Sequence, residues 1–254
     1  MVAGAGTAGS AAAIAAKQAG AGRVLLLDLA ERPGGALAAM GLRPAGDDGP
    51  LAAIGVQRSY RTALVEVAAG LHVRALGPTG ASRWRAKAVV LATGGREQTR
   101  GNLALPGTRP AGVLAAGAAL RLLAKTARLP GRRAIVAGHG RWAGVVARAL
   151  ERAGAAIEAI VPAVARVEGW PRVSGVVLED GRRCGCDLLV LATPLLPWLP
   201  PLLAGAAQLP GVFVAGGAAM GDLDERAAAE SGERAGREAA AYAIRVASSN
   251  REVR

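Results

Sequence analysis

The sequence is poor in aromatic and acidic residues and lacks long apolar runs. Phe, Trp and Tyr make up only 3% of its 254 residues, and 19 acidic residues stand against 31 Lys and Arg. Gly, Pro, Arg or Asp interrupts every apolar stretch before it reaches the roughly 18 residues of a membrane helix. The sequence therefore predicts no membrane span, and we expect a cytoplasmic protein.

Cysteine is also scarce. The chain holds two, Cys184 and Cys186, one residue apart, and nothing in their number indicates an oxidising compartment. We interpret Cys186, at the entry of an apolar strand, as a small buried hydrophobe. The opening Met1-Val2-Ala3-Gly4 lacks the charged region and apolar core of a signal peptide, so we expect none.

The shortage of acids gives a formal net charge of +12 and a pI of about 11.3. Such a balance can indicate nucleic-acid binding. The arginines are scattered, however, and no basic stripe is interleaved with aromatic residues. We interpret Arg as the general solvated surface residue and predict no nucleic-acid partner. A mildly positive field also suits a protein that binds an anionic dinucleotide.

A glycine-rich loop, Gly4-Ala5-Gly6-Thr7-Ala8-Gly9, stands at the start of the chain. In a dinucleotide-binding loop, the first glycine allows the tight turn and the second lets backbone N–H groups approach the pyrophosphate. The third lets the following helix pack close to the strand. The spacing of Gly4, Gly6 and Gly9 fits these three roles.

The segments after this loop support the same interpretation. Residues 10–20 are Ala-rich and helical in character, and the apolar run 23–28 ends in Asp28, 19 residues after Gly9. An acid at the end of the second strand is placed to accept hydrogen bonds from the adenosine ribose. The order of loop, helix, strand and acid predicts a dinucleotide site, most plainly for FAD.

The strand before this loop is short. Only Met1, Val2 and Ala3 precede Gly4, where about five or six apolar residues are usual. That strand is central in a dinucleotide-binding sheet, and shortening it exposes the edges of its neighbours. Either the first strand is stunted or the natural start lies further upstream, and we favour the upstream start.

A second glycine loop, Gly138-x-Gly140-x-x-Ala143, lies between a strand at 133–137 and a helix at 144–153. Its third position tolerates Ala. NAD(P) is therefore a second candidate cofactor, although Trp142 is bulky within the loop. The alternative is a retained fold that binds no second cofactor.

The strand after the second loop, at 156–161, ends at Pro162 without a carboxylate. NAD is therefore poorly supported, whereas Arg166 could hold the 2′-phosphate of NADP. Further strands are expected at 62–67, 71–76, 83–87, 88–92, 173–178, 187–192 and 212–217, and further helices at 111–127 and 225–246.

Three stretches carry a resemblance to a known family. Residues 88–97 read Ala-Val-Val-Leu-Ala-Thr-Gly-Gly-Arg-Glu, residues 100–119 hold Leu-Pro-Gly-Thr-Arg-Pro-Ala-Gly-Val, and Gly-Val-Phe-Val-Ala-Gly begins at Gly211. With Gly232-Glu233-Arg234-Ala235-Gly236, they resemble the two-dinucleotide-binding-domain flavoproteins, the pyridine nucleotide-disulfide oxidoreductase family. The branch is similar to FAD-containing subunits of opine, sarcosine and hydroxyproline oxidation, of hydrogen cyanide synthesis, and of glycerol 3-phosphate oxidation-linked proteins.

The resemblance implies an α/β fold in which a Rossmann-like FAD-binding domain is interrupted by a second, smaller Rossmann-like domain of NAD(P)-binding type. We expect residues 1–108 and 206–254 to form the first domain and residues 109–205 the second. The expected FAD contacts are Gly4, Gly6, Thr7, Ala8 and Gly9 at the pyrophosphate, Asp28 at the ribose, Gly34 and Gly35 near the flavin, Leu64 at the adenine, Thr93 and Gly94, and Gly216 and Gly217 at the ribityl chain and diphosphate. The second loop offers Gly138, Gly140 and Ala143.

The chain departs from the family pattern in four ways. Gly217 stands where Asp or Asn is frequent, and Asp222 is five residues beyond it. The stretch between Gly35 and Gly55 is far shorter than the usual loop and helix. No Cys-x-x-Cys follows Gly35, so disulfide-reductase chemistry is unsupported. The shortened second domain is the fourth departure.

The sequence identifies no catalytic residue and no metal site. His72 lies in an expected strand and His139 within the second loop, and neither forms a proton-transfer pair. Flavin chemistry depends on positioning more than on a protein nucleophile, so an enzyme is still expected.

The hypothesis is an FAD-dependent oxidoreductase, or the FAD-bearing subunit of one. It would oxidise an amine, amino-acid or polyol-type small molecule, and a second oxidoreductase subunit is a candidate partner. One alternative is a non-catalytic or degenerate nucleotide-binding subunit that scaffolds a partner flavoprotein, and another is an NADPH-binding protein without flavin.

Overall fold

The computed structural model describes residues 1–221 and 224–252, and it divides the chain into two compact units. Asp222 lies outside the described residues. Unit 1 contains Met1–Ala38, Pro44–Arg96 and Leu196–Arg254, and unit 2 contains Ala39–Arg43 and Glu97–Leu195. One unit is thus inserted in the sequence of the other.

Unit 1 is built on a five-stranded sheet with the order β15-β7-β1-β2-β3, in which every neighbouring pair is parallel. Its central strand β1 has only two residues, and both are buried. Short parallel strands with apolar residues on both faces are typical of a sheet covered on both sides. The strands are β1 (Val2–Ala3), β2 (Leu25–Leu27), β3 (Gln57–Ser59), β7 (Val89–Leu91) and β15 (Val212–Val214).

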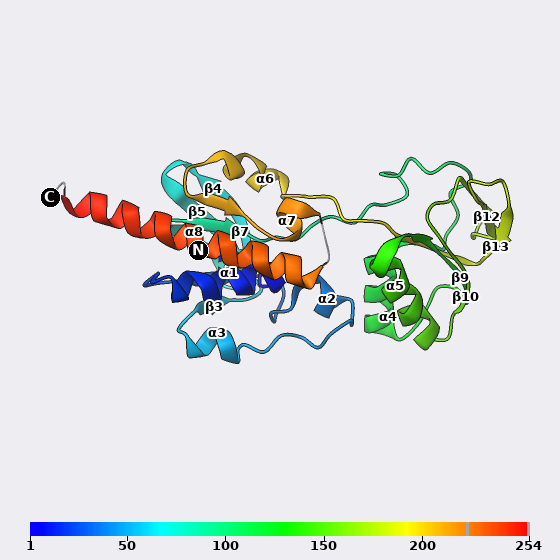
Figure 1. Cartoon of the computed structure of the whole chain (residues 1–254), viewed down its shortest axis with the longest axis horizontal. Helices are drawn as coiled ribbons and strands as arrows, with labels where there is room; N and C mark the ends of the chain where they lie inside the picture. The colour runs from blue at the N-terminus through cyan, green and yellow to red at the C-terminus, as the bar shows by residue number, and fades with distance from the viewer. Residues whose placement is uncertain (222–223, 253–254) are drawn as a thin grey trace. The chain divides into compact units, whose positions relative to one another are not determined.

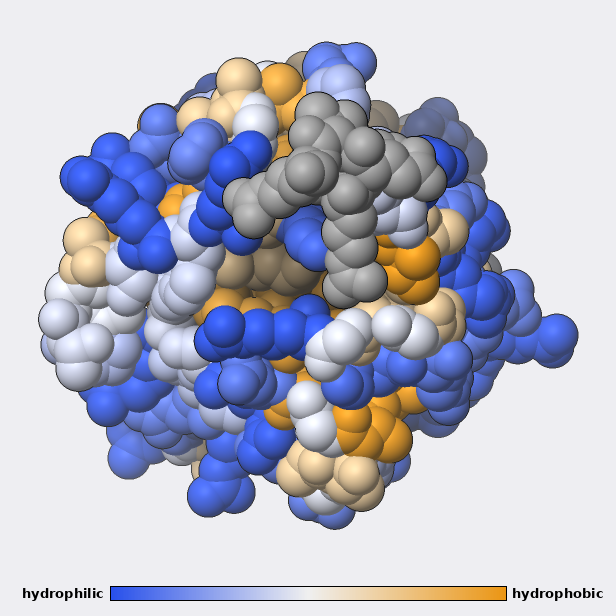
Figure 2. All heavy atoms as spheres, turned by 90° about the vertical axis from the view of Figure 1, so that its left-hand side faces the viewer, coloured by the Kyte–Doolittle hydropathy of each residue, from blue (hydrophilic) through white to orange (hydrophobic). Residues whose placement is uncertain are grey.

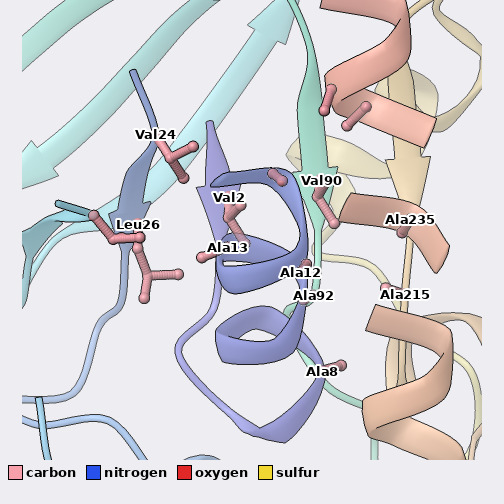
Figure 3. Packing of buried hydrophobic residues seen from close by; sticks show 14 of the residues in the cluster. Val2, Ala8, Ala12, Ala13, Val24, Leu26, Val90, Ala92, Ala215 and Ala235 are labelled. Carbon is pink, nitrogen blue, oxygen red and sulfur yellow. The ribbon is translucent and has the colours of Figure 1, made fainter. Parts of the chain in front are cut away.

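Two long helices, α1 (Thr7–Gln18) and α8 (Glu225–Glu252), lie side by side against one face of this sheet (Figure 1). The core between helices and sheet is made of small side chains, with Val2, Leu26 and Val90 from the strands facing alanines of α1 (Figure 3). Alanine-rich helices bury little side-chain volume, so the backbones must approach closely for this core to be filled.

Glycine makes the contact between α1 and α8 possible. A Cβ on Gly232 would lie 2.0 Å from the carbonyl oxygen of Ala8, and a Cβ on Gly236 would lie 2.2 Å from that of Ala12. These pairs are one helical turn apart, so a strip of bare backbone on α8 rests against the carbonyls of α1.

The other face of the sheet packs against a second hydrophobic cluster, which includes Ala3, Val89 and Leu91 from the parallel strands. Over this cluster lies an antiparallel three-stranded sheet, β4-β5-β6. The remaining elements of unit 1 are short. They are α2 (Gly35–Ala39), α3 (Gly49–Ala53), β4 (Ala63–Ala68), η1 (Ala69–Leu71), β5 (His72–Gly77), β6 (Gly80–Arg85), α6 (Pro201–Ala204), η2 (Gly205–Gln208) and α7 (Gly217–Met220).

Unit 2 repeats the plan on a smaller scale. A parallel sheet with the order β10-β9-β14-β8 is accompanied by two helices, and a separate antiparallel sheet, β11-β12-β13, shares its core. The elements are β8 (Val113–Ala115), α4 (Ala116–Thr126), β9 (Arg133–Gly138), α5 (Gly140–Arg152), β10 (Ala156–Val161), β11 (Arg166–Glu168), β12 (Gly175–Val177), β13 (Arg183–Gly185) and β14 (Leu188–Ala192).

Two features of unit 2 bear on expectations from the sequence. The helix expected over 111–127 begins only at Ala116, because Val113–Ala115 pairs with β14 as an edge strand. Both cysteines are free thiols, and Cys186 packs in the core of unit 2. Burial, aided by the charge of Asp187, raises the pKa of Cys186 to about 11, so the thiol stays protonated at neutral pH.

The first residue of the chain lies inside unit 1. The ammonium of Met1 donates a hydrogen bond to the carbonyl oxygen of Ala88 at 2.8 Å, and the carbonyl of Met1 accepts from the N–H of Val90 at 2.9 Å. Burial removes the ammonium from water and lowers its pKa from 8.0 to about 6.

This shift predicts that the free energy of unfolding falls as the pH falls from 8 to 6. The unfolded chain binds the proton at the higher pH, so in this range it holds more protons than the folded chain. The loss should reach about 2–3 kcal/mol below pH 6. Urea unfolding at pH 9 and pH 5.5 measures it, with N-acetylated protein as the control that lacks the titrating group. An equal loss in the acetylated protein would contradict the assignment.

The contact between α1 and α8 generates a second prediction. Gly236→Ala should destabilise the protein by about 1–3 kcal/mol, because the added methyl group meets a fixed backbone carbonyl. Gly144→Ala in α5 is the matched control, since its Cβ would meet only the end of the Arg148 side chain at 3.5 Å. The control should be neutral or slightly stabilising. Similar Tm values for the two variants would refute the close contact.

Candidate dinucleotide-binding site

The glycine loop of unit 1 is held in a tight turn between β1 and α1. Gly4 has a positive φ of 105°, and a Cβ there would lie 2.2 Å from the carbonyl oxygen of Ala92. A Cβ on Gly9 would lie 1.7 Å from the carbonyl oxygen of Gly4. Both positions therefore require glycine, and both fix the start of α1 against the end of the sheet.

The N-terminus of α1 is open toward the loop. Helix α1 begins at Thr7, Gly6 is its N-cap without a side-chain capping bond, and no acidic residue lies in the first turn. The N–H groups of the first turn and the positive end of the helix dipole favour an anion such as a phosphate. The arrangement fits the pyrophosphate role that the sequence predicts for this loop.

Asp28 lies directly after β2 and is bonded to the loop. One carboxylate oxygen accepts a hydrogen bond from the N–H of Ala5, and the other accepts from the N–H of Ala30 at 2.6 Å. Each oxygen keeps a second lone pair for another donor. The carboxylate is thus oriented by the backbone and still able to accept from hydroxyl groups.

Gly34 and Gly35 meet the first loop backbone to backbone. The N–H of Gly34 donates to the carbonyl of Ala5 at 2.9 Å, and a Cβ on Gly35 would lie 2.7 Å from the Cα of Gly6. Both glycines have positive φ. A side chain at Gly35 would collide with Gly6, and one at Gly34 would collide with Ala38 and come close to Gly46.

Thr93 follows β7 on the other side of the first loop. Its hydroxyl is buried and has no hydrogen-bond partner among the described residues. Gly94 beside it has a positive φ of 83° and open space where a Cβ would stand. A buried hydroxyl without a partner is costly, and a polar ligand would satisfy it.

Gly216 and Gly217 close the group of loops. Gly216 has a positive φ of 62°, and a Cβ there would lie 2.5 Å from that of Ala8 in the first turn of α1. Its N–H donates to the hydroxyl of Ser231 at 3.1 Å, and Ser231 is buried in α8. Gly217 begins α7, so this turn adds another short helix start near the loop.

Five segments therefore gather at the carboxyl ends of parallel strands, where open α/β sheets bind their ligands. Gly4 to Gly9, Asp28, Thr93 with Gly94, and Gly216 with Gly217 each follow a strand of unit 1, and Gly34 with Gly35 contacts the first of them. The residues fit a dinucleotide, because the start of α1, the oriented carboxylate of Asp28 and the orphaned hydroxyl of Thr93 lie at this one end of the sheet.

Leu64 belongs to a different part of unit 1. It lies in β4, pairs with Ala75 of β5, and its partly buried side chain packs against the cluster that contains Val67 and Leu71. Its contact with adenine stays a prediction.

The second loop has the same construction in unit 2. A Cβ on Gly138 would lie 2.2 Å from the carbonyl oxygen of Ala192. A Cβ on Gly4 would lie at the same distance from the carbonyl oxygen of Ala92. Helix α5 begins at Gly140 without a side-chain cap, and Ala143 is buried one turn later. The second glycine loop that the sequence predicts therefore has the same backbone geometry as the first.

Thr193 repeats the position of Thr93, and it is a residue that the sequence analysis missed. Its hydroxyl is also buried without a partner among the described residues. The signal was available, because Leu-Ala-Thr follows the apolar strand in both units. Arg166, the residue considered for a 2′-phosphate, is exposed at the start of β11.

The histidines do not join these loops. His72 lies on the exposed face of β5, and His139 is the exposed N-cap of α5.

Within residues 1–221 and 224–252, no group of three His, Cys, Asp or Glu side chains could hold a metal ion. Over the same residues, no helix is both long and apolar enough to cross a membrane.

Comparison by sequence gives no relative, since neither a family model nor a curated protein matches the chain. Comparison by structure gives many. L-proline dehydrogenase from P. horikoshii matches with a TM-score of 0.71 and 23% identity over 92% of this chain and 53% of that one. Thioredoxin reductase from Lactococcus lactis matches with a TM-score of 0.69 and 17% identity over 96% of this chain and 98% of that one.

A pyridine nucleotide-disulfide family oxidoreductase from Enterococcus faecalis has a TM-score of 0.62 and 18% identity, covering 95% of this chain and 68% of that one. These matches confirm the predicted α/β fold of two Rossmann-like units. The chain spans little more than half the length of the proline dehydrogenase chain, 53%.

The tight turn between Gly4 and Gly9 generates a prediction. Gly9→Ala should destabilise the protein by about 1–3 kcal/mol, because its methyl group has no room beside the carbonyl of Gly4. Gly205→Ala, where nothing lies within 4 Å of the added Cβ, is the control and should keep the stability of the parent. Thermal unfolding of both variants measures the difference, and equal Tm values would be inconsistent with the described turn.

Proposed function

We propose that this chain binds FAD in unit 1 and serves as an FAD-dependent oxidoreductase or as the FAD-bearing subunit of one. The observation that carries the proposal is the gathering of five loops, four of them containing glycine, around the open N-terminus of α1. The fold shared with solved oxidoreductases supports it.

Each loop has a role in this proposal. The N–H groups at Gly6 to Ala8 would bind the pyrophosphate, and Asp28 would accept from the adenosine ribose. Gly34 with Gly35 would leave room on the flavin side. The hydroxyl of Thr93 would donate its unused hydrogen bond to the cofactor, and the turn at Gly216 and Gly217 would border the ribityl chain and diphosphate.

FAD would supply a two-electron acceptor for a substrate carbon bound to nitrogen or oxygen. We propose an amine, amino acid or polyol as that substrate. The name of the L-proline dehydrogenase supports the amino-acid option. The chain's own part would be to hold the cofactor and to keep side chains out of the space around Gly6 and Gly35.

A second oxidoreductase subunit would complete the substrate side. Between Gly35 and Gly55 the chain forms only α2 and α3, each of five residues. Little of the chain is therefore available there to enclose a small molecule.

The second loop is proposed as an NAD(P) site. Its open helix start and the orphaned hydroxyl of Thr193 support a dinucleotide. The segment after β10, which begins Pro162-Ala163, offers no carboxylate for an unmodified ribose. Titration with NADPH and with NADH would compare the two forms, and failure to bind either would leave unit 2 without a cofactor.

The absorbance spectrum of the protein, as purified and after incubation with FAD, tests the central proposal. We expect one FAD per chain and a flavin band that persists through gel filtration. Bleaching of that band under anaerobic conditions by an amino acid, amine or polyol would support the substrate class. Binding without bleaching by any of them would favour the non-catalytic subunit, and the absence of FAD binding would refute the proposal.

Asp28→Ala should weaken FAD binding by about 10- to 100-fold, because hydrogen bonds to a charged group contribute about 1.5–3 kcal/mol. Asp180→Ala is the matched control. Asp180 lies in an exposed turn and accepts from the N–H two residues later, at Arg182, as Asp28 does from Ala30. Fluorescence titration with FAD should give parental affinity for the control, and equal affinities for the two variants would remove Asp28 from the site.

A further inference from the structure

Two hollows border strand β6 of unit 1. One is a cavity of about 610 Å³ that is lined in part by Met1 and Ile244, and Figure 2 shows a hollow with hydrophobic residues at the bottom and hydrophilic residues around it. The other, of about 260 Å³, lies on the outer face of the sheet β4-β5-β6. We call it the cationic hollow, because Arg74, Arg83 and Arg85 are among the residues that line it.

The basic side chains reach the outer face because they alternate with buried ones. In β5, His72 and Arg74 are exposed and Val73 between them is buried. In β6, Arg83 and Arg85 are exposed, and Trp84 between them packs against the hydrophobic cluster beneath the sheet. The sheet therefore buries one face and presents basic side chains on the other.

On this outer face, basic side chains lie directly opposite one another. Arg83 pairs with Arg74 in the register of the sheet, and Arg85 pairs with His72. Arg74 forms an ion pair with Glu66 at 3.0 Å, and Glu66 is the one acid among the described residues that line the cationic hollow. Like charges directly opposite each other destabilise a sheet, so an anion bound here would remove a cost.

The hairpin between β5 and β6 determines the direction of the backbone groups in β6. It closes with Gly77 opposite Gly80. Pro78 has no N–H, so this closing pair must itself exchange two hydrogen bonds. Bonded and non-bonded pairs alternate along an antiparallel ladder, so Ser82 and Trp84 also bond to β5. The N–H of Ala86 follows the same alternation, since it donates to Leu71 at 2.9 Å.

The other residues of β6 point their backbone groups away from β5. They are Ala81, Arg83 and Arg85, and all three are exposed. Within the described residues, β6 has β5 as its one neighbour in the sheet. An edge of this kind is a template for another strand, and here the open backbone groups belong to the residues that carry the unbalanced charge.

We propose that the free edge of β6 binds an extended acidic segment of a partner protein, which adds to the sheet as an antiparallel strand. Residues directly opposite each other have side chains on the same face, so Asp or Glu at every second position lies beside Arg83 and Arg85. Carboxylates match the guanidinium fork. A nucleic acid would satisfy the arginines but not the backbone groups between them, whereas an acidic strand satisfies both.

The first test uses the peptide acetyl-Glu-Thr-Glu-Thr-Glu-Thr-Glu-amide, labelled with fluorescein, and the full chain at low ionic strength. The glutamates of this peptide lie on one face of a strand. The matched control peptide is methylated on the backbone nitrogens of its two inner glutamates, which keeps its charge and removes two N–H donors to β6. Fluorescence anisotropy should show at least about tenfold weaker binding of the control.

The second test changes the protein. Arg83→Gln combined with Arg85→Gln should weaken binding of the first peptide at least about tenfold, because charge-assisted hydrogen bonds to two carboxylates are lost. Arg128→Gln combined with Arg152→Gln is the matched control, since it removes the same charge from exposed residues of unit 2. The control variant should bind within about twofold of the parent.

Amide exchange followed by NMR gives a readout at the backbone. Saturating peptide should slow exchange at Ala81, Arg83 and Arg85 at least about tenfold. The amides of Ser82 and Trp84 already bond to β5 and should exchange at an unchanged rate. Unchanged exchange at the first three amides would overturn the addition of a strand.

Two further outcomes would also overturn the proposal. One is equal affinity of the two peptides or of the two double variants. The other is an eight-nucleotide oligothymidylate that binds as tightly as the peptide and is weakened by the same arginine substitutions, which would assign the face to nucleic acid. None of these measurements requires FAD, so their outcome is independent of the proposed function.

Discussion

The close approach of α1 to its neighbours is the contact on which the candidate site depends. On one side, Gly9 lets the first turn of α1 touch the carbonyl of Gly4, and on the other, Gly232 and Gly236 of α8 rest on carbonyls of the same helix. The first turn is thereby fixed from both sides, and its N–H groups point to one place. A helix start that could shift would offer the same N–H groups without a defined direction, and anion binding depends on that direction.

The same construction appears in both units, which indicates that the loop geometry is a property of the fold and not of one sequence. The pairs Gly4 with Ala92 and Gly138 with Ala192 place a strand end against a loop in the same way. The residues around the two glycine loops differ. Unit 1 adds an oriented carboxylate, Asp28, at the end of the next strand, and unit 2 has none at the end of β10. The two loops are therefore alike toward phosphates and unlike toward the ribose.

Much of the fold could be predicted from the sequence, because most of the parallel strands are apolar runs that are followed closely by glycine, threonine or an acid, namely β1, β2, β7, β9, β14 and β15. The two glycine loops, Asp28 and the order of the two units follow from such local patterns. The edge strands β3 and β8 were harder to predict. Val113–Ala115 of β8 is continuous with a helical stretch, so the pattern predicts helix there, and β3 is polar because its side chains reach the surface. Contacts between distant segments could not be predicted, because nothing in the local sequence indicates that Ser231 accepts a hydrogen bond from Gly216.

The bare interface between α1 and α8 has a consequence for how unit 1 folds. Alanine and glycine have no side-chain rotamers to restrict, so ordering this interface costs almost no side-chain entropy, and the opposing term is the backbone entropy of its glycines. The interface also cannot adapt, because no flexible side chain is present to rearrange around an error in helix position. We expect the two helices to dock in a single register or not at all, which would make their association an all-or-none step.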